Sequence, residues 1–202
     1  MSKIISIIDY GAGNLQSVSN ALDYLGINNI ITSDKAEIEK SGAVILPGVG
    51  AFPDAMDSLI ASGLIDTIKE QTKIKPFLGI CLGMQMLFTK GMEITERDGL
   101  NLIPGTVELI KTELKLPQIG WNSLNILKET PLTKGISSGE YVYFVHSFYA
   151  KCSNRENLYA ATDYGTEVAA IVGDGYIYGC QFHPEKSGEV GLTILKNFGG
   201  MI

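Results

Sequence analysis

One segment of the chain reads Lys75-Pro76-Phe77-Leu78-Gly79-Ile80-Cys81-Leu82-Gly83-Met84-Gln85. The apolar residues before Cys81 predict a buried strand, and those that follow predict a helix that starts at once. Two glycines, Gly79 and Gly83, stand two residues away on either side of the cysteine. This is the nucleophile-elbow pattern, with cysteine where hydrolases carry serine. It predicts a strand-to-helix turn so crowded that only glycine fits on either side.

Such a turn would set the sulfur at the N-terminus of a helix, where backbone N–H dipoles favour a thiolate. The N–H of Leu82 would then be available to a tetrahedral oxyanion. Most free cysteines are small buried hydrophobic residues. That interpretation holds for Cys152 and Cys180, which lie in no elbow, whereas the context of Cys81 favours a nucleophile.

Around the elbow, apolar runs alternate with amphipathic stretches. In the first half we expect strands at 3–9, 29–31, 43–47 and 77–80, and helices at 15–25, 35–40, 53–61 and 64–72. In the second half we expect strands at 105–116, 118–122, 140–147, 158–162, 168–172 and 177–183, and a helix at 190–197. Alternating strands and helices imply a mostly parallel sheet covered on both faces. The prediction is one α/β domain, residues 1–202, with an added antiparallel β region.

A base for the thiol is suggested by His183-Pro184-Glu185, at the end of the last predicted strand. Residues two apart in an extended chain point the same way, so His183 and Glu185 would project together. The carboxylate could then hold one ring nitrogen while the other faces a thiol. The only other histidine, His146, has no carboxylate two residues away. We interpret it as a wall of the site or a core histidine with satisfied nitrogens.

The composition excludes several classes of function. The formal net charge is -6, which argues against a surface for nucleic acid or an anionic membrane. The apolar segment 4–8 is too short for a signal-peptide core or a membrane span. Three cysteines without a CxxC pair suggest neither a disulfide framework nor a zinc site, so no metal is predicted. A reduced, cytoplasmic chain is the natural expectation.

The segments Gly79–Gln85 and His183–Glu185 together resemble the class I, or triad, glutamine amidotransferases. Further segments make the chain similar to the glutaminase subunits of imidazole glycerol phosphate synthase, an enzyme of histidine biosynthesis: Asp9–Asn14, Pro47–Phe52, Gly120–Asn122, Tyr143–Ser147 and Gln181–Gly188. The resemblance spans essentially the whole chain. Its one minor departure is Phe148, where related chains often carry tyrosine. It implies a flavodoxin-like α/β fold and no cofactor.

The resemblance also implies a reaction. Cys81 would attack the side-chain amide of glutamine, and His183 would protonate the departing ammonia. His183 would next activate water to hydrolyse the thioester, while Glu185 orients the imidazole.

Other positions match the family's binding residues. The Gly48–Gly50 loop would supply the second oxyanion donor, from Val49 or Gly50, after a peptide flip linked to the partner's state. Its glycines make that flip sterically feasible. Gln85, Ser147 and Phe148 match positions that hold the α-amino and α-carboxylate groups of glutamine.

A partner is implied in the same way, a (βα)8-barrel cyclase subunit that forms a heterodimer and receives the ammonia. Asn14, Trp121, Tyr143 and Lys186 match positions at or near that contact. Tryptophan is common at interface hot spots, although Trp121 could be a core residue instead. Lys186 could equally be a solvated surface charge.

Other interpretations remain open. The turn at 11–16 follows a strand and opens a helix, as in dinucleotide-binding proteins, but Gln16 stands where the third glycine should be. A paralogous glutaminase could feed ammonia to a synthase that aminates a sugar. A free-standing cysteine hydrolase of another amide or peptide is disfavoured by the Gly48–Gly50 loop and the Tyr143–Ser147 segment. A non-enzymatic binding module would explain none of these motifs.

Overall fold

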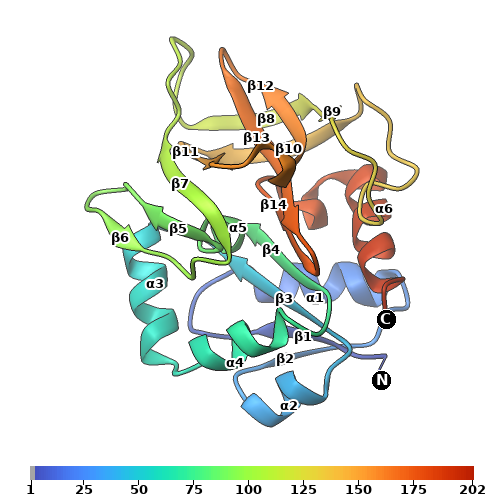
Figure 1. The fold of residues 1–202 in the computed structure, drawn as a ribbon. Coiled ribbons are helices and arrows are strands. Elements are labelled where there is room, and N and C mark those ends of the chain that lie inside the picture. Colours follow the sequence, from blue (N-terminus) through green and yellow to red (C-terminus); the bar gives the residue numbers. More distant parts are fainter. Residues whose placement is uncertain (1–2) are drawn as a thin grey trace.

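The computed structural model describes residues 3–202, and an eight-stranded sheet runs through its centre (Figure 1). In spatial order its strands are β2 (Asn29–Thr32), β1 (Ile5–Ile8), β3 (Ala43–Gly48), β4 (Phe77–Cys81), β14 (Ile177–Cys180), β13 (Glu167–Asp174), β12 (Leu158–Asp163) and β9 (Asn125–Ile126). The first five strands are parallel, and the last three pair antiparallel. The parallel strands follow the order 2-1-3-4-5 along the chain, which is the flavodoxin-like order. The predicted α/β fold is confirmed.

Helices cover both faces of the sheet, as predicted. On one face α1 (Leu15–Tyr24) and α6 (Gly188–Gly199) share an apolar cluster with the strands. On the other face, α2 (Lys35–Lys40), α3 (Phe52–Ala61) and α4 (Ile65–Gln71) contribute to a second cluster. The apolar spacing explains these contacts: Val18 and Leu22, four residues apart on α1, are both buried.

Further strands form the β region that gathers beyond the carboxyl ends of the parallel strands (Figure 1). A four-stranded sheet has the order β11 (Phe148–Cys152), β7 (Ile103–Leu109), β5 (Phe88–Gly91) and β6 (Arg97–Asp98). A two-stranded ribbon pairs β10 (Tyr141–His146) with β8 (Gln118–Ser123), antiparallel. The predicted antiparallel region is present in the pairs β8–β10, β7–β11 and β5–β6, whereas the β5–β7 pair is parallel.

The second half of the chain also departs from the predicted boundaries. The predicted strand 105–116 was wrong beyond Leu109, because the chain turns there. The Thr112 hydroxyl accepts a hydrogen bond from the N–H of Leu114, a local turn that competes with strand pairing. The strands β5, β6, β9 and β11 were not predicted at all. They are short. Apart from the local pair β5–β6, their pairing partners lie far away in the sequence.

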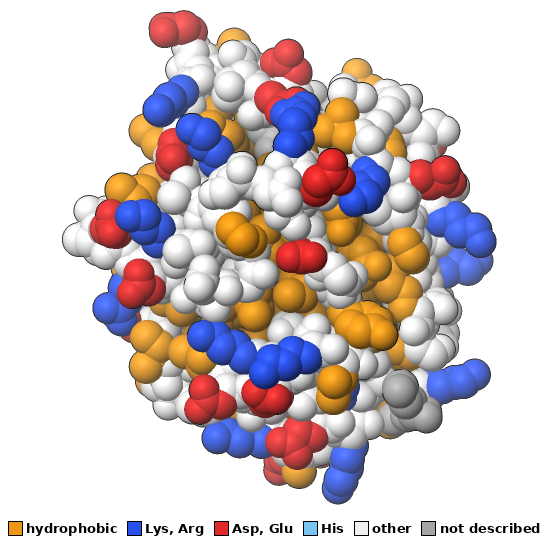
Figure 2. Space-filling view, viewed as in Figure 1, with side chains coloured by type: hydrophobic (Ala, Val, Ile, Leu, Met, Phe, Trp, Pro, Cys, Tyr) orange, Lys and Arg blue, Asp and Glu red, His pale blue; other side chains and the backbone are white. Residues whose placement is uncertain are grey.

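The surface carries no single dominant sign of charge on the face shown in Figure 2, where acidic and basic side chains are interspersed. For residues 3–202, every helix falls short of the length and apolarity that a bilayer crossing requires.

Candidate active site

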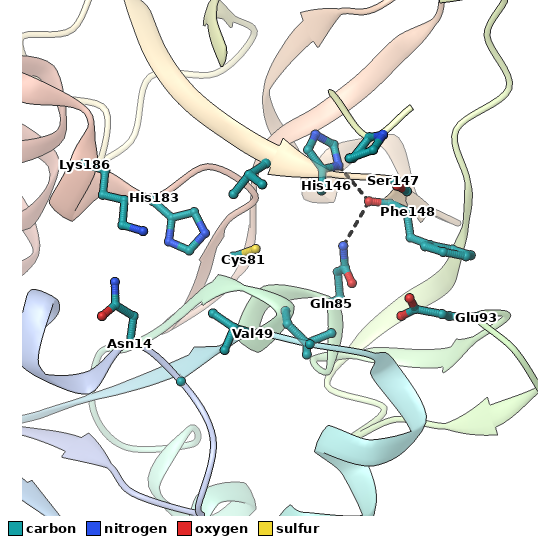
Figure 3. A pocket seen from close by; sticks show the side chains of 15 residues that line it. Asn14, Val49, Cys81, Gln85, Glu93, His146, Ser147, Phe148, His183 and Lys186 are labelled. Atoms are coloured by element: carbon teal, nitrogen blue, oxygen red, sulfur yellow. Dashed lines mark hydrogen bonds between the residues drawn. The ribbon is translucent and has the colours of Figure 1, made fainter. Parts of the chain in front are cut away.

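A pocket of about 610 Å³ opens where β3, β4 and β14 end (Figure 3). In open parallel sheets, ligands bind at this carboxyl edge. The pocket is lined by side chains from segments far apart in the sequence, among them Cys81, Gln85 and His183. The fold therefore brings the predicted nucleophile and the predicted base to one place.

Cys81 occupies the sharp turn between β4 and α5 (Leu82–Gln85), with φ at 55°. Positive φ is strained for a non-glycine residue and is often found at active sites. A Cβ on Gly79 would lie 2.7 Å from the carbonyl oxygen of Gly83, and a Cβ on Gly83 would overlap that of Leu46. Both flanking glycines are thus required by sterics, as the sequence predicted. The helix after the cysteine is shorter than predicted, because the chain soon enters β5.

His183 and Glu185 are in direct contact. The Nδ1–H of His183 donates to Oε1 of Glu185 at 2.8 Å, and their side chains are only 4% and 0% exposed. The prediction that an extended chain brings these two side chains together was wrong. β14 ends at Cys180, and Glu185 lies in a 3-10 turn, Pro184–Lys186. Proline suits the first position of such a turn because its φ is already helical and no N–H is lost.

The backbone around this histidine is held from two sides. The N–H of His183 donates to the carbonyl of Tyr143 on β10 at 3.1 Å. The Ser187 hydroxyl donates to the carbonyl of His183 at 2.6 Å and accepts from the N–H of Tyr143 at 3.0 Å. The imidazole is therefore positioned by the β8–β10 ribbon as well as by its own loop.

The imidazole of His183 and the sulfur of Cys81 lie side by side in the pocket (Figure 3). Burial lowers the pKa of His183, but hydrogen bonds and negative charge from Cys81 and Glu185 outweigh it and raise this pKa to about 9. At neutral pH the ring is thus mostly an imidazolium, which can donate a proton to a leaving group.

Cys152 and Cys180 lie outside the pocket, whereas His146 lines it, as predicted for a wall of the site. Cys180 is fully buried, and burial raises the pKa of its thiol. Burial raises the pKa of Cys152 to about 11. Burial also lowers the pKa of His146 to about 4, so this ring is neutral. Its Nδ1 contacts the Phe148 carbonyl at 2.7 Å and its Nε2 contacts the Gln118 side chain at 3.0 Å.

The predicted substrate positions surround one end of the pocket. The two N–H bonds of the Gln85 amide donate to the Phe148 carbonyl and to Oε1 of Gln181, each at 3.0 Å. The Oε1 atom of Gln85 is left as an acceptor. Ser147 and Phe148 line the same pocket.

Two residues at the site, Glu93 and Gln181, were not predicted from the sequence. Glu93 lines the pocket on the side of Gln85 and accepts a hydrogen bond from the N–H of Phe52 at 2.7 Å (Figure 3). It lies just after β5, a strand that was not predicted, and belongs to no motif. The Nε2 atom of Gln181 lies 3.9 Å from the Cys81 sulfur. Gln181 could have been predicted as a site residue from its position two residues before His183.

The predicted oxyanion donors border the cysteine. Gly48, at the end of β3, is in register with Cys81 at the end of β4. Val49 and Gly50 follow and line the pocket, and Leu82 lines it from the start of α5.

The predicted interface residues fall in two groups. Trp121 and Tyr143 are directly paired across the β8–β10 ribbon, with ring centroids 6.0 Å apart. Trp121 is 55% exposed, so the interpretation as a core tryptophan was wrong. Asn14 and Lys186 lie at the His183 end of the pocket (Figure 3). Across the part of the chain that the structure describes, no group of three His, Cys, Asp or Glu side chains could hold a metal.

Comparison with known proteins identifies the family. The model of the class-I glutamine amidotransferases matches residues 6–200. The imidazole glycerol phosphate synthase subunit HisH of Caldanaerobacter subterraneus is 54% identical, covering 98% of both chains, and that of Bacillus thuringiensis is 52% identical, covering 98% of this chain and 95% of its own. The solved structure of PurLQS from Thermotoga maritima has the same fold, with a TM-score of 0.77 at 18% identity and 98% of both chains covered. This chain therefore belongs to the class I glutamine amidotransferase family.

Proposed function

We propose that residues 1–202 form the glutaminase subunit of imidazole glycerol phosphate synthase, which hydrolyses glutamine and passes ammonia to a cyclase subunit in histidine biosynthesis. One observation carries the proposal. Cys81, His183 and Glu185 meet in one pocket, in a chain 54% identical to a HisH subunit over almost its full length. No cofactor is needed for this hydrolysis.

The chemistry follows from the positions of the three side chains. The Cys81 thiolate attacks the side-chain amide carbon of glutamine, and the oxyanion formed is stabilised by the N–H of Leu82 and by an N–H of the Val49–Gly50 loop. The His183 imidazolium protonates the leaving ammonia. The neutral ring then takes a proton from water, which hydrolyses the thioester to glutamate. Glu185 holds the tautomer and stabilises the imidazolium.

The substrate is oriented by groups at the other end of the pocket. The α-ammonium of glutamine needs acceptors, and Oε1 of Gln85 and the carboxylate of Glu93 supply them. The backbone at Ser147 and Phe148 holds the α-carboxylate. The Phe148 carbonyl is itself fixed by Gln85 and His146, so this wall of the pocket is rigid.

The partner surface continues from the pocket. The outer face of the β8–β10 ribbon exposes Ile119 by 62%, Trp121 by 55% and Tyr141 by 58%, and Val145 of the same ribbon lines the pocket. Exposed aromatic and aliphatic residues of this kind suit the centre of a protein interface. A (βα)8-barrel cyclase docked here, against Tyr143 and against Asn14 and Lys186 at the pocket mouth, receives ammonia without its release to solvent.

The test uses the complex of this chain with the cyclase from the same source. Cys81→Ala should abolish glutamine-dependent synthesis of imidazole glycerol phosphate and leave ammonia-dependent synthesis intact. Cys152→Ala, which changes a half-buried cysteine outside the pocket, should retain both activities. Loss of both activities in Cys81→Ala would reject the role in ammonia supply.

The same preparation separates the alternatives. The isolated chain should hydrolyse glutamine slowly and gain activity when the cyclase and its nucleotide ligand are added. Full activity of the chain alone would favour a free-standing hydrolase. Co-purification with a sugar-aminating synthase would instead assign the paralogous pathway.

A further inference from the structure

Tyr10 carries a buried hydroxyl that the proposed mechanism does not use. The residue follows β1 and is 5% exposed. Among residues 3–202, its Oη atom has no hydrogen-bond partner. A buried polar group without a partner is unfavourable, and each case in a folded protein calls for an explanation.

The hydroxyl lies beside Gly48, the first residue of the proposed oxyanion loop. A Cβ built on Gly48 would lie 3.0 Å from Oη of Tyr10, 3.0 Å from Cβ of Leu82 and 2.7 Å from the backbone N of Gly83. Oη therefore occupies space beside Gly48 that a side chain would otherwise fill. Burial, and then the charge of Cys81, raise the pKa of Tyr10, so its hydroxyl stays protonated and can donate.

The loop beside this hydroxyl has room to change conformation. Gly50 has φ at +97°, and a Cβ there would meet no atom within 4 Å. Val49, between the two glycines, is 44% exposed. A peptide plane flanked by glycines can rotate without displacing a packed side chain.

The Gly48 carbonyl and the Val49 N–H belong to one planar peptide unit, so their orientations are linked. In a trans peptide the C=O and the N–H point in opposite directions. When the Gly48 carbonyl turns inward, towards Tyr10, the N–H of Val49 therefore turns outward, into the pocket where the oxyanion forms. That conformation gives the orphan hydroxyl its missing acceptor.

We propose that Tyr10 is a positioning residue: its hydroxyl donates to the Gly48 carbonyl in the turned loop and so holds the Val49 N–H towards the oxyanion. The inference rests on the proposed function, because it requires this loop to supply an oxyanion donor. In this proposal the buried hydroxyl forms its hydrogen bond only when the loop has turned, and it does not stabilise the chain before that.

The experiment compares Tyr10→Phe with the wild type in the full complex, with the cyclase and its nucleotide ligand present. Loss of one hydrogen bond should lower kcat for glutamate release about tenfold, or ~1.4 kcal/mol, with the KM for glutamine unchanged. Ammonia-dependent synthesis should not change. The thermal midpoint of the isolated chain should stay the same or rise, because the removed group has no partner there. Tyr159→Phe, a buried tyrosine on β12, should change none of these quantities.

Several results would overturn the inference. An unchanged kcat shows that the hydroxyl does not position the loop. A fall in kcat with a higher KM, or with a lower thermal midpoint, assigns Tyr10 to binding or packing instead. Glutamate release is measured separately from synthesis, so a wild type that releases glutamate without synthesis refutes the proposed pathway but still tests Tyr10. A wild type that releases no glutamate refutes both.

Discussion

Replacing Glu185 by glutamine tests the electrostatic basis of the site. Glu185 accepts from Nδ1 of His183 at 2.8 Å, and the pair is almost fully buried. In Glu185→Gln the new side-chain oxygen can still accept that hydrogen bond. The negative charge that stabilises the imidazolium is lost, however, so the pKa of His183 should fall.

The raised pKa of His183 sets how much its protonation contributes to the free energy of unfolding, and how that contribution changes with pH. The ordinary value of 6.5 is raised to about 9 in the folded chain, so folding favours the protonated ring. This stabilisation is fully present below pH 6.5 and is lost as the pH rises through 9. It amounts to ~3 kcal/mol of the free energy of unfolding. Because Cys81 also raises the pKa, the substitution should remove only part of it, at least ~1 kcal/mol.

The assay is urea denaturation of the isolated chain at a series of pH values from 6 to 9.5. The free energy of unfolding of the wild type should fall across this range, and that of Glu185→Gln should fall less. Glu189→Gln, an exposed acid at the start of α6, is the matched control and should follow the wild type. In the complex, kcat for glutamate release by Glu185→Gln should drop by ~100-fold or more. Parallel stability profiles of Glu185→Gln and the wild type would refute the assigned charge interaction.

Two further substitutions test the elbow and the partner surface. Gly83→Ala should lower the free energy of unfolding by at least ~2 kcal/mol in urea titrations, because its Cβ would overlap the Leu46 carbonyl, whereas Gly200→Ala, at the end of α6, should have little effect. Equal stabilities would contradict the steric argument. Trp121→Ala should weaken binding to the cyclase by ~2 kcal/mol in calorimetric titrations without lowering the thermal midpoint. Tyr24→Ala, exposed by 76% on α1, is the control, and an unchanged affinity of Trp121→Ala would remove the ribbon from the interface.

Local patterns were enough to predict the elements that carry the chemistry. The strand and the two glycines around Cys81 are a steric requirement that acts within a few residues, so they are visible in the sequence. The alternation of apolar strands and amphipathic helices likewise predicted a parallel sheet with both faces covered. The spacing of His183 and Glu185 predicted their contact, although a 3-10 turn and not an extended chain produces it.

Features that depend on contacts between distant segments could be determined only from the tertiary structure. The strands β5, β9 and β11 are short and pair with strands elsewhere in the sequence, so no local pattern marks them. β6 is only two residues long and pairs with β5. Glu93 reaches the pocket only because β5 pairs with β7, and the exposure of Trp121 depends on which face of its ribbon packs inward. The lack of a hydrogen-bond partner for the Tyr10 hydroxyl also depends on tertiary structure, because it is set by the atoms that pack around the hydroxyl in the folded chain.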